Sequence, residues 1–398
     1  MRILFVTPYL PIAPKMRPFG FITRLAERHE IDLVALEKPA TAQAAEGSAQ
    51  LAELRERCAS VTIVPLEKTR ALRNCLTALP SREPLRVAYC RTPAFEEEIT
   101  RRLRTGRYDV LHVDRERLAG IGRLAQGTGV RTLLDYCDAV SDYNRNAAAA
   151  VGRLDQRIIL SEDTRRMVRW ERDVRPLFDA AIVTSPADRR ALGGGGVPDV
   201  TVVPIGVDLD AFAPDDTPEI PGRLVFVGSM SYLPNVDAAH FLAKEVLPAV
   251  RRHRPEATLA LVGAEPEKSV LALGELPGVT VTGMVPAVQP WMREAELIVT
   301  PLRIGGGFPQ KLAEAMAMGK AVLANPEVAA GLDVAHGREL EIATRAGFAD
   351  AVVDLLGDPG RRAALGASAR RFAEDTLEWA PVMDLLESLY RAEAPAVA

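Results

Sequence analysis

Lys311 and Glu314 stand three residues apart, just after the glycines Gly305, Gly306 and Gly307. The glycines separate an apolar run, "ELIVTPLRI", from a helical pattern that starts at Phe308. Glycines have no side chain, so their backbone N–H groups can approach a ligand closely. The N-terminus of a helix binds phosphate favourably. Lys311 adds a positive charge, while Glu314, on the same helix face, can bind vicinal hydroxyls. This pattern predicts a ligand with both phosphate and sugar hydroxyls, such as a nucleoside diphosphate carrying a sugar.

A structural interpretation of the same residues stays open. Glycine-rich turns between a strand and a helix occur in many α/β proteins that bind nothing there, and Lys311 with Glu314 is also a common solvated pair. The spacing is neither a Walker loop nor G-x-G-x-x-G, so a dinucleotide-dependent oxidoreductase is not indicated.

Polar residues also end two strands predicted in the first half of the chain. "YDVLHVDRERLAG" places His112 and Asp114 after one strand, and "LLDYCDAVSD" places Asp135, Asp138 and Ser141 after the next. Since ligands bind at the carboxyl ends of parallel strands, an imidazole or carboxylate there could accept a proton from a hydroxyl. Alternatively, His112 is a buried structural residue, and the two aspartates cap helices and turns.

Apolar runs alternate with helical patterns along nearly the whole chain. Strands are expected at 2–8, 30–36, 60–66, 108–114, 131–137, 180–185, 200–206, 223–229, 257–263, 279–283, 296–301 and 320–325, and helices at 43–57, 94–104, 162–175, 236–251, 308–318 and 345–355. Most of the strands are continuously apolar, as buried parallel strands are. This indicates α/β architecture with two doubly wound parallel-sheet, Rossmann-like domains facing across a cleft.

The predicted boundary falls in a segment rich in Pro, Asp and Gly near residues 193–222. We expect an N-terminal domain at 1–204 and a C-terminal domain at 205–375. A last amphipathic helix at 376–392 is expected to pack back on the first domain.

Composition narrows the class of protein. The 398 residues are 48% apolar and 26% charged, which is globular, and the net charge of −4 gives no bulk attraction to nucleic acid. The four cysteines form no C-x-x-C pair, so reduced thiols are expected. No uncharged apolar run approaches the ~20 residues of a membrane span, and the N-terminus lacks a signal-peptide pattern. A cytoplasmic protein is expected, with peripheral membrane contact left open.

Three ordered motifs in the second half resemble a known family. They are "FVGSMSYLPNVDAAHFLAKEVLPAVRRHRPEATLALVG", "LPGVTVTGMVPAVQPWMREAELIVTPLRIGGG" and "PLRIGGGFPQKLAEAMAMGKAVLANPEVAAGLD". They are similar to the donor-site signature of family-4 retaining glycosyltransferases of the GT-B fold, and "VVPIGVDLDAFAP" resembles the linker of those enzymes. The nearest subgroup is that of bacterial exopolysaccharide-type sugar transferases. The N-terminal half fits more loosely, through "MRILFVTPYLPIAP" and "RLAERHEIDLVAL".

The resemblance implies roles for the donor-site residues. Glu314 would bind the ribose hydroxyls, Lys311 the diphosphate, and the glycine loop the sugar and phosphate. The loop after a strand, Gly283 to Val285, would pack along the nucleobase. The expected donor-binding set is Gly228, Gly283, Met284, Val285, Arg303, Gly305, Gly306, Gly307, Phe308, Lys311 and Glu314.

The sequence departs from the family pattern at three places. Gly306 replaces a second glutamate that many members carry, which puts the donor sugar in doubt. Ser229 and Met230 stand where many relatives have a phosphate-binding arginine, and Arg303 is expected to supply that charge, unless it is an ordinary surface arginine. The glycine-rich turn after the first strand is shortened. Arg17 is expected to face the acceptor there, as is Ser141 in the first half of the chain.

The resulting expectation is a retaining, hexosyltransferase-like enzyme that moves a sugar from a nucleoside-diphosphate donor to an acceptor hydroxyl. The candidate catalytic residues are His112, Asp114, Asp135 and Asp138. Neither a metal site nor a cofactor is expected, because the chain lacks a credible Asp-x-Asp motif and Lys311 with Arg303 would hold the leaving-group charge. The acceptor could be a glycan, a lipid-linked sugar or a small natural product. Two alternatives remain: a nucleotide-sugar hydrolase or epimerase of the same fold, and a catalytically silent nucleotide-sugar-binding partner subunit.

Overall fold

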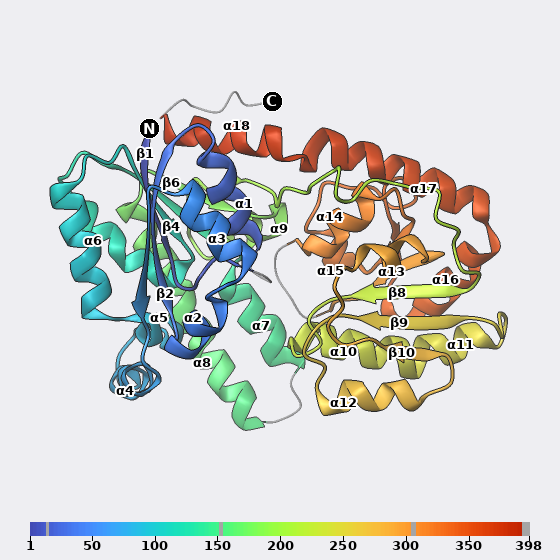
Figure 1. The fold of residues 1–398 in the computed structure, drawn as a ribbon. Helices are drawn as coiled ribbons and strands as arrows, with labels where there is room; N and C mark the ends of the chain where they lie inside the picture. The colour runs from blue at the N-terminus through green and yellow to red at the C-terminus, as the bar shows by residue number, and fades with distance from the viewer. Residues whose placement is uncertain (13–15, 151–153, 304–307, 392–398) are drawn as a thin grey trace. The chain divides into compact units, whose positions relative to one another are not determined.

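The computed structural model describes residues 1–12, 16–150, 154–303 and 308–391. The chain divides into two compact units, each described by itself below (Figure 1). Unit 1 comprises Met1–Val203 with Met383–Ala398, and unit 2 comprises Pro204–Val382. The chain therefore passes between the units twice.

Unit 1 is built on an all-parallel sheet of seven strands in the order β3-β2-β1-β4-β5-β6-β7. The order reverses between β1 and β4, and ligands of such sheets bind outside the carboxyl ends at this kind of position. The strands are β1 (Arg2–Thr7), β2 (Glu30–Glu37), β3 (Ser60–Pro65), β4 (Val110–Asp114), β5 (Arg131–Cys137), β6 (Ala180–Val183) and β7 (Thr201–Val202).

Continuous apolar runs form these strands because helices cover both faces of the sheet. In β1, Ile3, Leu4, Phe5 and Val6 are all fully buried, so neither face meets solvent. The helices of unit 1 are α1 (Met16–Leu25), α2 (Pro39–Ala45), α3 (Ala49–Arg57), α4 (Lys68–Ala78), α5 (Leu85–Cys90), α6 (Pro93–Thr105), α7 (Val140–Ala150), α8 (Leu154–Val174) and α9 (Pro186–Gly194), with 3₁₀ turns η1 (Glu116–Ala125) and η2 (Arg175–Leu177).

The single helix expected over 43–57 is wrong, because α2 and α3 are separate helices. Gly47 between them has φ +84°, a left-handed conformation that ends a helix and suits glycine. Ser48 then starts α3 by accepting a hydrogen bond from the backbone N–H of Leu51.

Unit 2 has an all-parallel sheet of six strands in the order β10-β9-β8-β11-β12-β13, and its order reverses between β8 and β11. The strands are β8 (Arg223–Val227), β9 (Thr258–Val262), β10 (Val279–Val281), β11 (Leu297–Thr300), β12 (Val322–Ala324) and β13 (Glu341–Ile342). The last of them was not predicted.

Helices pack on this sheet as well. They are α10 (Leu233–Phe241), α11 (Leu247–Arg251), α12 (Lys268–Leu271), α13 (Gln289–Arg293), α14 (Gln310–Ala317), α15 (Pro326–Ala329), α16 (Phe348–Gly357) and α17 (Pro359–Phe372). The helix expected over 236–251 is interrupted by a π-helical turn at Leu242–Val246. Pro248 lies two residues beyond this turn. Its ring carries no N–H and disfavours a regular helix before it, and the wider turn accommodates it.

The final helix, α18 (Trp379–Tyr390), begins in unit 2 and ends in unit 1. At its start, the Trp379 ring lies so close to Gly206 that a Cβ there would be 2.3 Å from it. At its end, Tyr390 hydrogen-bonds His112, and Arg131 Nε donates to the carbonyl of Leu389 at 2.7 Å. The end of the last helix is thus part of the framework of unit 1.

The structure also describes the cysteines and the composition of the helices. Cys58, Cys75, Cys90 and Cys137 are all free thiols. None of the helices in the described ranges has both the length and the apolar composition of a membrane-spanning segment.

Candidate functional site

The helix that carries Lys311 and Glu314, α14, begins two residues later than expected. Pro309 is its N-cap, with extended backbone at φ −69° and ψ 121°, and Gln310 is the first helical residue. Phe308, expected within the helix, precedes it and is buried in the core with Leu312. Gly305, Gly306 and Gly307 lie outside the described residues.

Lys311 lies against the carboxyl end of β8 and the start of α10. Its Nζ donates to Asn235 Oδ1 at 2.7 Å and sits 4.1 Å from the centre of the Phe226 ring. A Cβ added to Gly228 would lie 2.9 Å from the same nitrogen. Glycine at position 228 therefore makes room for the amine. Of these neighbours, only Gly228 was expected from the sequence.

The surroundings of the Lys311 amine disfavour its charge. Burial lowers its pKa to about 7, although Glu314 acts in the opposite direction. Within the described ranges, no carboxylate forms an ion pair with it; the neutral Asn235 amide and the Phe226 ring face are its contacts. An anion placed beside this nitrogen would restore its charged form.

Glu314 lies one helical turn after Lys311. Its Oε1 accepts a hydrogen bond from Gln310 Nε2 at 3.0 Å, and burial raises the pKa of the carboxyl to about 7. Opposite shifts in two close groups are the usual result of drawing both away from water. A ligand that gives phosphate to one and hydroxyls to the other would offset both costs.

Two glycines bring the ends of β8 and β9 together. Gly228 N donates to Val262 O at 2.9 Å, and a Cβ on Gly263 would lie 1.9 Å from the Gly228 carbonyl oxygen. Gly263 also has φ +149°, which side chains rarely adopt. Sequence reasoning missed Gly263 as a site residue. Its position directly after a predicted strand was the available signal.

Arg303 is engaged by a carboxylate. Its Nε and Nη2 donate to both oxygens of Asp237 at 2.6 and 2.5 Å, a bidentate pair. Arg345 approaches the same carboxylate at 3.9 Å. The cation expected to assist Lys311 is therefore held by α10 in this structure, with its side chain 43% exposed.

The loop after β10 holds the remaining donor-site candidates. Gly283 has φ +67°, and its carbonyl accepts from Thr282 Oγ1 at 2.8 Å. Val285 packs on the core, whereas Met284 is 79% exposed. An exposed methionine beside a left-handed glycine offers a pliable apolar surface.

In unit 1, the structure brings Asp114 and Asp135 together. They stand opposite each other in the register of β4 and β5. Arg17, from α1, donates from Nε to Asp135 Oδ2 at 3.0 Å and from Nη1 to the carbonyl of Val203 at 2.9 Å. The backbone N–H of Cys137 donates to the other oxygen of Asp135 at 2.7 Å. Asp135 is thus a fixed, paired carboxylate.

Asp114 differs from Asp135 in its environment. It is only 2% exposed, and its Oδ2 has no hydrogen-bond partner among the described residues. Burial is the main cause that raises its pKa to about 7. A carboxyl that titrates near neutrality suits proton transfer.

His112 is enclosed between an aromatic ring and a hydroxyl of the protein itself. Its ring stacks on Phe5 at 4.1 Å, and its Nδ1 is 2.6 Å from the Tyr390 hydroxyl. Burial lowers its pKa to about 3, so it is neutral. These contacts are those of a structural residue that joins β4 to α18, which was the alternative interpretation of the sequence.

Asp138 and Ser141 take different positions around the strand ends. Asp138 Oδ2 accepts from Arg115 Nη1 at 2.9 Å and remains partly exposed. Ser141 is 3% exposed, and its backbone N–H donates to Glu171 Oε1 at 3.0 Å. Arg115 and Cys137 have φ of 73° and 63°, which is strained for residues with side chains. Such strain at the carboxyl ends of β4 and β5 is common at functional sites.

Two parallel-sheet units, each with a reversal of strand order, are the architecture of the GT-B glycosyltransferases. Residues 19–211 match the model of glycosyltransferase family 4, and residues 221–358 match that of glycosyl transferases group 1. The chain belongs to family 4 of the glycosyltransferases.

Two curated relatives are named as glycosyltransferases. A GDP-mannose-dependent alpha-(1-6)-phosphatidylinositol monomannoside mannosyltransferase from Mycolicibacterium smegmatis is 30% identical over 44% of this chain and 52% of its own length. A D-inositol 3-phosphate glycosyltransferase from Catenulispora acidiphila is 29% identical over 51% of this chain and 54% of its own. The chain thus spans about half the length of the curated relatives it matches.

Solved structures show the same fold at low sequence identity. HepE of Anabaena in complex with UDP aligns with a TM-score of 0.69 at 14% identity, covering 98% of this chain and 100% of its own. Sucrose-phosphate synthase from Thermosynechococcus elongatus aligns with a TM-score of 0.70 at 17% identity, covering 98% of each chain. Closeness to exopolysaccharide-type transferases stays a prediction.

Proposed function

We propose that this protein transfers a sugar from a nucleoside-diphosphate donor to an acceptor hydroxyl, with retention at the anomeric carbon and without a metal ion. The observation that carries the proposal is the Lys311 amine, which lies against Gly228 with Glu314 one turn away. This lysine lacks a carboxylate partner in the described ranges, and the adjacent carboxyl is drawn away from water. Phosphate and ribose would supply what these two side chains lack.

The donor would lie across the strand ends of unit 2. Lys311 and the start of α14 would bind the diphosphate, and Glu314 the ribose. The exposed Met284, next to Gly283, would cover a base. GDP-mannose in the name of one relative and UDP in a structure of the same fold support a nucleoside-diphosphate sugar without fixing the base.

Protein groups would stabilise the leaving diphosphate. Its negative charge grows as the bond to the sugar breaks, so a positive charge at Lys311 stabilises the transition state more than the ground state. Arg303 would assist after exchanging Asp237 for phosphate, and the protein needs no cofactor beyond the donor co-substrate.

The acceptor would bind to unit 1. Asp114 has the environment of a general base, because its carboxyl titrates near neutrality. Asp135 and Arg17 would orient the acceptor as a fixed ion pair, with Asp138 at the exposed edge. His112 and Ser141 would support this edge from inside the unit.

A surface of α4 favours acceptors that are linked to lipid. Leu72, Leu76 and Leu79 follow helical spacing and are 50%, 67% and 52% exposed. Lys68 and Arg73 lie beside them in the sequence. An apolar strip with basic neighbours suits peripheral contact with an anionic membrane.

One experiment separates the proposal from its alternatives. The purified protein is screened by thermal shift against UDP, GDP, TDP and their sugars, since a bound donor stabilises the fold by mass action. Release of nucleoside diphosphate is then followed with and without acceptors, and the anomeric configuration of the product is read by NMR. Acceptor-dependent release with a retained configuration is expected.

The other outcomes are equally informative. Turnover of the donor without an acceptor would indicate a hydrolase or epimerase. Donor binding with no turnover under any acceptor would indicate a silent partner subunit. An inverted product would refute retention.

A further inference from the structure

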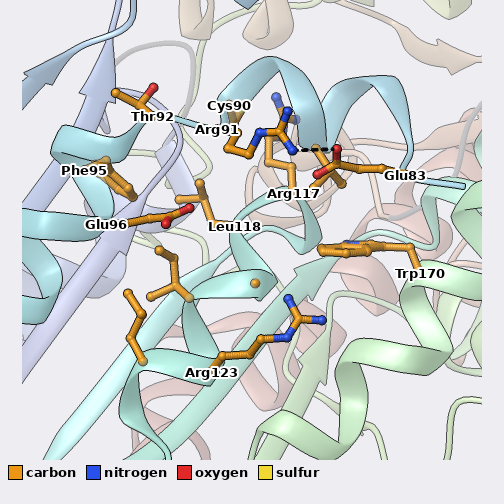
Figure 2. Close-up of a pocket in the computed structure, with 14 residues that line it drawn as sticks. Glu83, Cys90, Arg91, Thr92, Phe95, Glu96, Arg117, Leu118, Arg123 and Trp170 are labelled. Atoms are coloured by element: carbon orange, nitrogen blue, oxygen red, sulfur yellow. Dashed lines mark hydrogen bonds and ion pairs between the residues drawn. The ribbon is translucent and has the colours of Figure 1, made fainter. Parts of the chain in front are cut away.

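Unit 1 contains a hollow that the proposed transfer reaction does not use. It has a volume of about 320 Å³ and lies between α5, α6, η1 and α8 (Figure 2). That volume falls at the lower end of the range of small-molecule sites. Its lining side chains come from residues 83 to 170, so no single motif in the sequence marks it.

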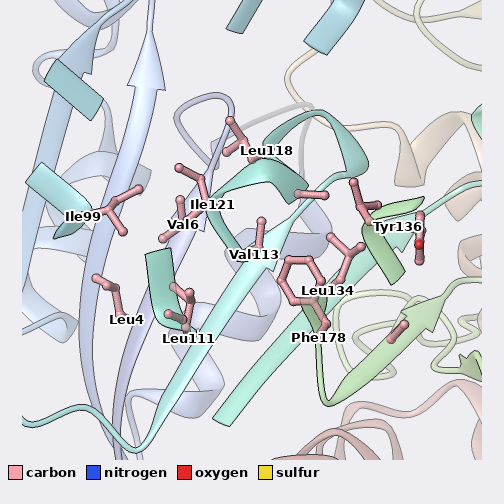
Figure 3. Close-up of a cluster of buried hydrophobic side chains, with 14 of the residues drawn as sticks. Leu4, Val6, Ile99, Leu111, Val113, Leu118, Ile121, Leu134, Tyr136 and Phe178 are labelled. Carbon is pink, nitrogen blue, oxygen red and sulfur yellow. The ribbon is translucent and has the colours of Figure 1, made fainter. Parts of the chain in front are cut away.

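The hollow lies on the opposite side of the sheet from Asp114. Side chains of a strand alternate between the two faces, so Leu111 and Val113 face away from His112 and Asp114. Leu111 and Val113 belong to a core cluster that includes Leu118 (Figure 3), and Leu118 also lines the hollow. The hydrophobic core therefore separates this site from the proposed acceptor site.

One wall of the hollow is flat and apolar. The Trp170 indole lines it and is fixed by a hydrogen bond from its Nε1 to the carbonyl of Glu116 at 2.8 Å. Gly120 lies beside the ring: a Cβ there would be 3.8 Å from Trp170 Cη2 and 3.6 Å from Arg123 Nη1. The missing side chain at position 120 leaves this part of the hollow open.

Polar groups with unused hydrogen-bonding capacity line the other walls. Thr92 is 4% exposed, and its hydroxyl has no hydrogen-bond partner in the described part of the chain. The Nε of Arg117 is buried and equally without a partner there. Buried polar groups are nearly always hydrogen-bonded, so these two indicate a ligand or solvent in the hollow. Arg91, by contrast, is held by Glu83 at 3.2 Å.

The surroundings of the hollow are basic, although the chain as a whole has a net charge of −4. A second hollow, lined by Arg101 and Arg104, shares Glu96 and Leu124 with it, and a third, lined by Arg70 and Arg73, shares Arg91 and Glu96. Of the described residues that line the three hollows, seven are arginines and three are glutamates. The shared residues make the hollows one continuous tract.

We infer that this tract binds an anionic oligosaccharide at a site separate from the transfer reaction. A sugar ring presents a flat face of C–H groups that can stack on the Trp170 indole, while its hydroxyls can bond Thr92. Carboxylates on the sugars would pair with Arg117 and Arg123, whose planar guanidinium groups match carboxylate geometry. A free phosphate ion would use the arginines but leave the indole and the adjoining hollows empty.

The test measures binding of tetragalacturonate, with maltotetraose as the neutral match, by isothermal titration calorimetry on the full chain. Saturable binding of tetragalacturonate that weakens with added salt is expected, with maltotetraose at least about tenfold weaker. Arg123→Gln alters an exposed side chain and should weaken binding about tenfold. Gly120→Leu, which fills the hollow beside Trp170, should abolish it. Arg169→Gln, an exposed arginine on α8 outside the three hollows, is the matched control and should leave binding unchanged.

Several results would overturn the inference. They are an absence of tetragalacturonate binding, equal binding of maltotetraose, or unchanged binding in Arg123→Gln. Binding of anionic phospholipid vesicles that Gly120→Leu weakens, without binding of tetragalacturonate, would instead assign the tract to a membrane. Oligosaccharide binding is measured without donor or turnover. The binding inference can therefore fail while the proposed transfer activity stands, and the transfer activity can fail while the binding inference stands.

Discussion

Asp114 and Asp135 face each other across neighbouring strands, yet only Asp135 is fixed by an arginine, Arg17. Burial raises the pKa of Asp114 to about 7. Two adjacent carboxyls in environments this different are suited to different tasks, one to exchange a proton and one to stay ionised.

Asp114→Asn is expected to lower transfer by about 10²- to 10⁴-fold, the range for loss of a general base. Donor affinity should stay unchanged, because Asp114 belongs to unit 1. Steady-state rates and donor titrations measure both. Asp138→Asn, at the exposed edge, is the control and should lower the transfer rate less than Asp114→Asn does. A rate for Asp114→Asn within twofold of the wild type would remove Asp114 from this role.

The same substitution should change the dependence of stability on pH. The folded-state pKa of Asp114, about 7, is above its ordinary 3.8. The folded protein then holds a proton that the unfolded chain releases, so stability falls as pH rises from about 4 to about 7, by at most about 1.4 kcal/mol per pKa unit. In thermal melts across this pH range, the stability of Asp114→Asn should fall less than that of the wild type. If stability fell equally with pH in the wild type and in Asp114→Asn, Asp114 would not be the cause of the pH dependence.

Lys311→Met is expected to reduce turnover by about 10²- to 10³-fold, as does loss of one preorganised donor. It should also remove a pH dependence. The pKa of Lys311 in the free protein is about 7, so affinity for a nucleotide sugar should weaken as pH rises above that value. Nucleotide sugars suit this titration because their phosphates are diesters and stay ionised. Lys244→Met, an exposed lysine of unit 2, is the control. Wild-type turnover in a folded Lys311→Met protein would place the diphosphate elsewhere.

Glu314→Ala should weaken binding of the correct nucleoside diphosphate by about 1 to 3 kcal/mol, the cost of lost hydrogen bonds to a charged group. The 2′,3′-dideoxy form of the same nucleotide provides the control, because it has no hydroxyls for Glu314 to bind. The substitution should therefore leave its affinity unchanged. An equal loss for both nucleotides would show that Glu314 does not hold the ribose.

Arg303→Ala should lower turnover less than Lys311→Met, because Arg303 is bound to Asp237 before the donor arrives. Asp237→Asn should release the guanidinium and tighten diphosphate binding severalfold, since breaking the bidentate pair no longer opposes it. Calorimetry on the single and double variants gives the coupling. If Asp237→Asn tightens binding equally without Arg303, the arginine does not reach the phosphate.

Transfer should continue in excess EDTA, because Lys311 is assigned the charge-stabilising role that a metal ion has in other transferases. The rate of nucleoside diphosphate release before and after chelation measures this. A complete loss that Mg²⁺ or Mn²⁺ restores would refute the assignment.

The sequence predicted the sheets well, because buried parallel strands are continuous apolar runs. Ile3 to Val6 illustrate this, with every side chain fully buried. It missed β13 because Glu341–Ile342 is only two residues long and has no such run. It also missed α17, although Asp358 followed by Pro359 is a helix-start signal, and the Asp358 side chain accepts from Arg361 N.

The placement of Lys311 and Glu314 on one helix was predictable, because their spacing along the chain determines it. Contacts between segments far apart in the sequence could not be predicted. Asn235 binds Lys311 from 76 residues away, and Asp237 holds Arg303 from 66 residues away. The hollow beside Trp170 could not be predicted for the same reason, because its lining residues come from four separate elements.

The contacts of α18 have a consequence for how the chain is made. Unit 1 needs Tyr390 beside His112 and Leu389 beside Arg131, so residues near position 390 complete a unit whose other residues have all been translated by residue 203. At ordinary synthesis rates, roughly 10 to 40 s separate residue 203 from residue 390 on the ribosome. During that time the nascent unit 1 exposes the surface that α18 will cover. Chaperones that shield this surface, or a codon-dependent pause, would therefore affect the yield of folded protein more than they would in a protein whose domains close in sequence order.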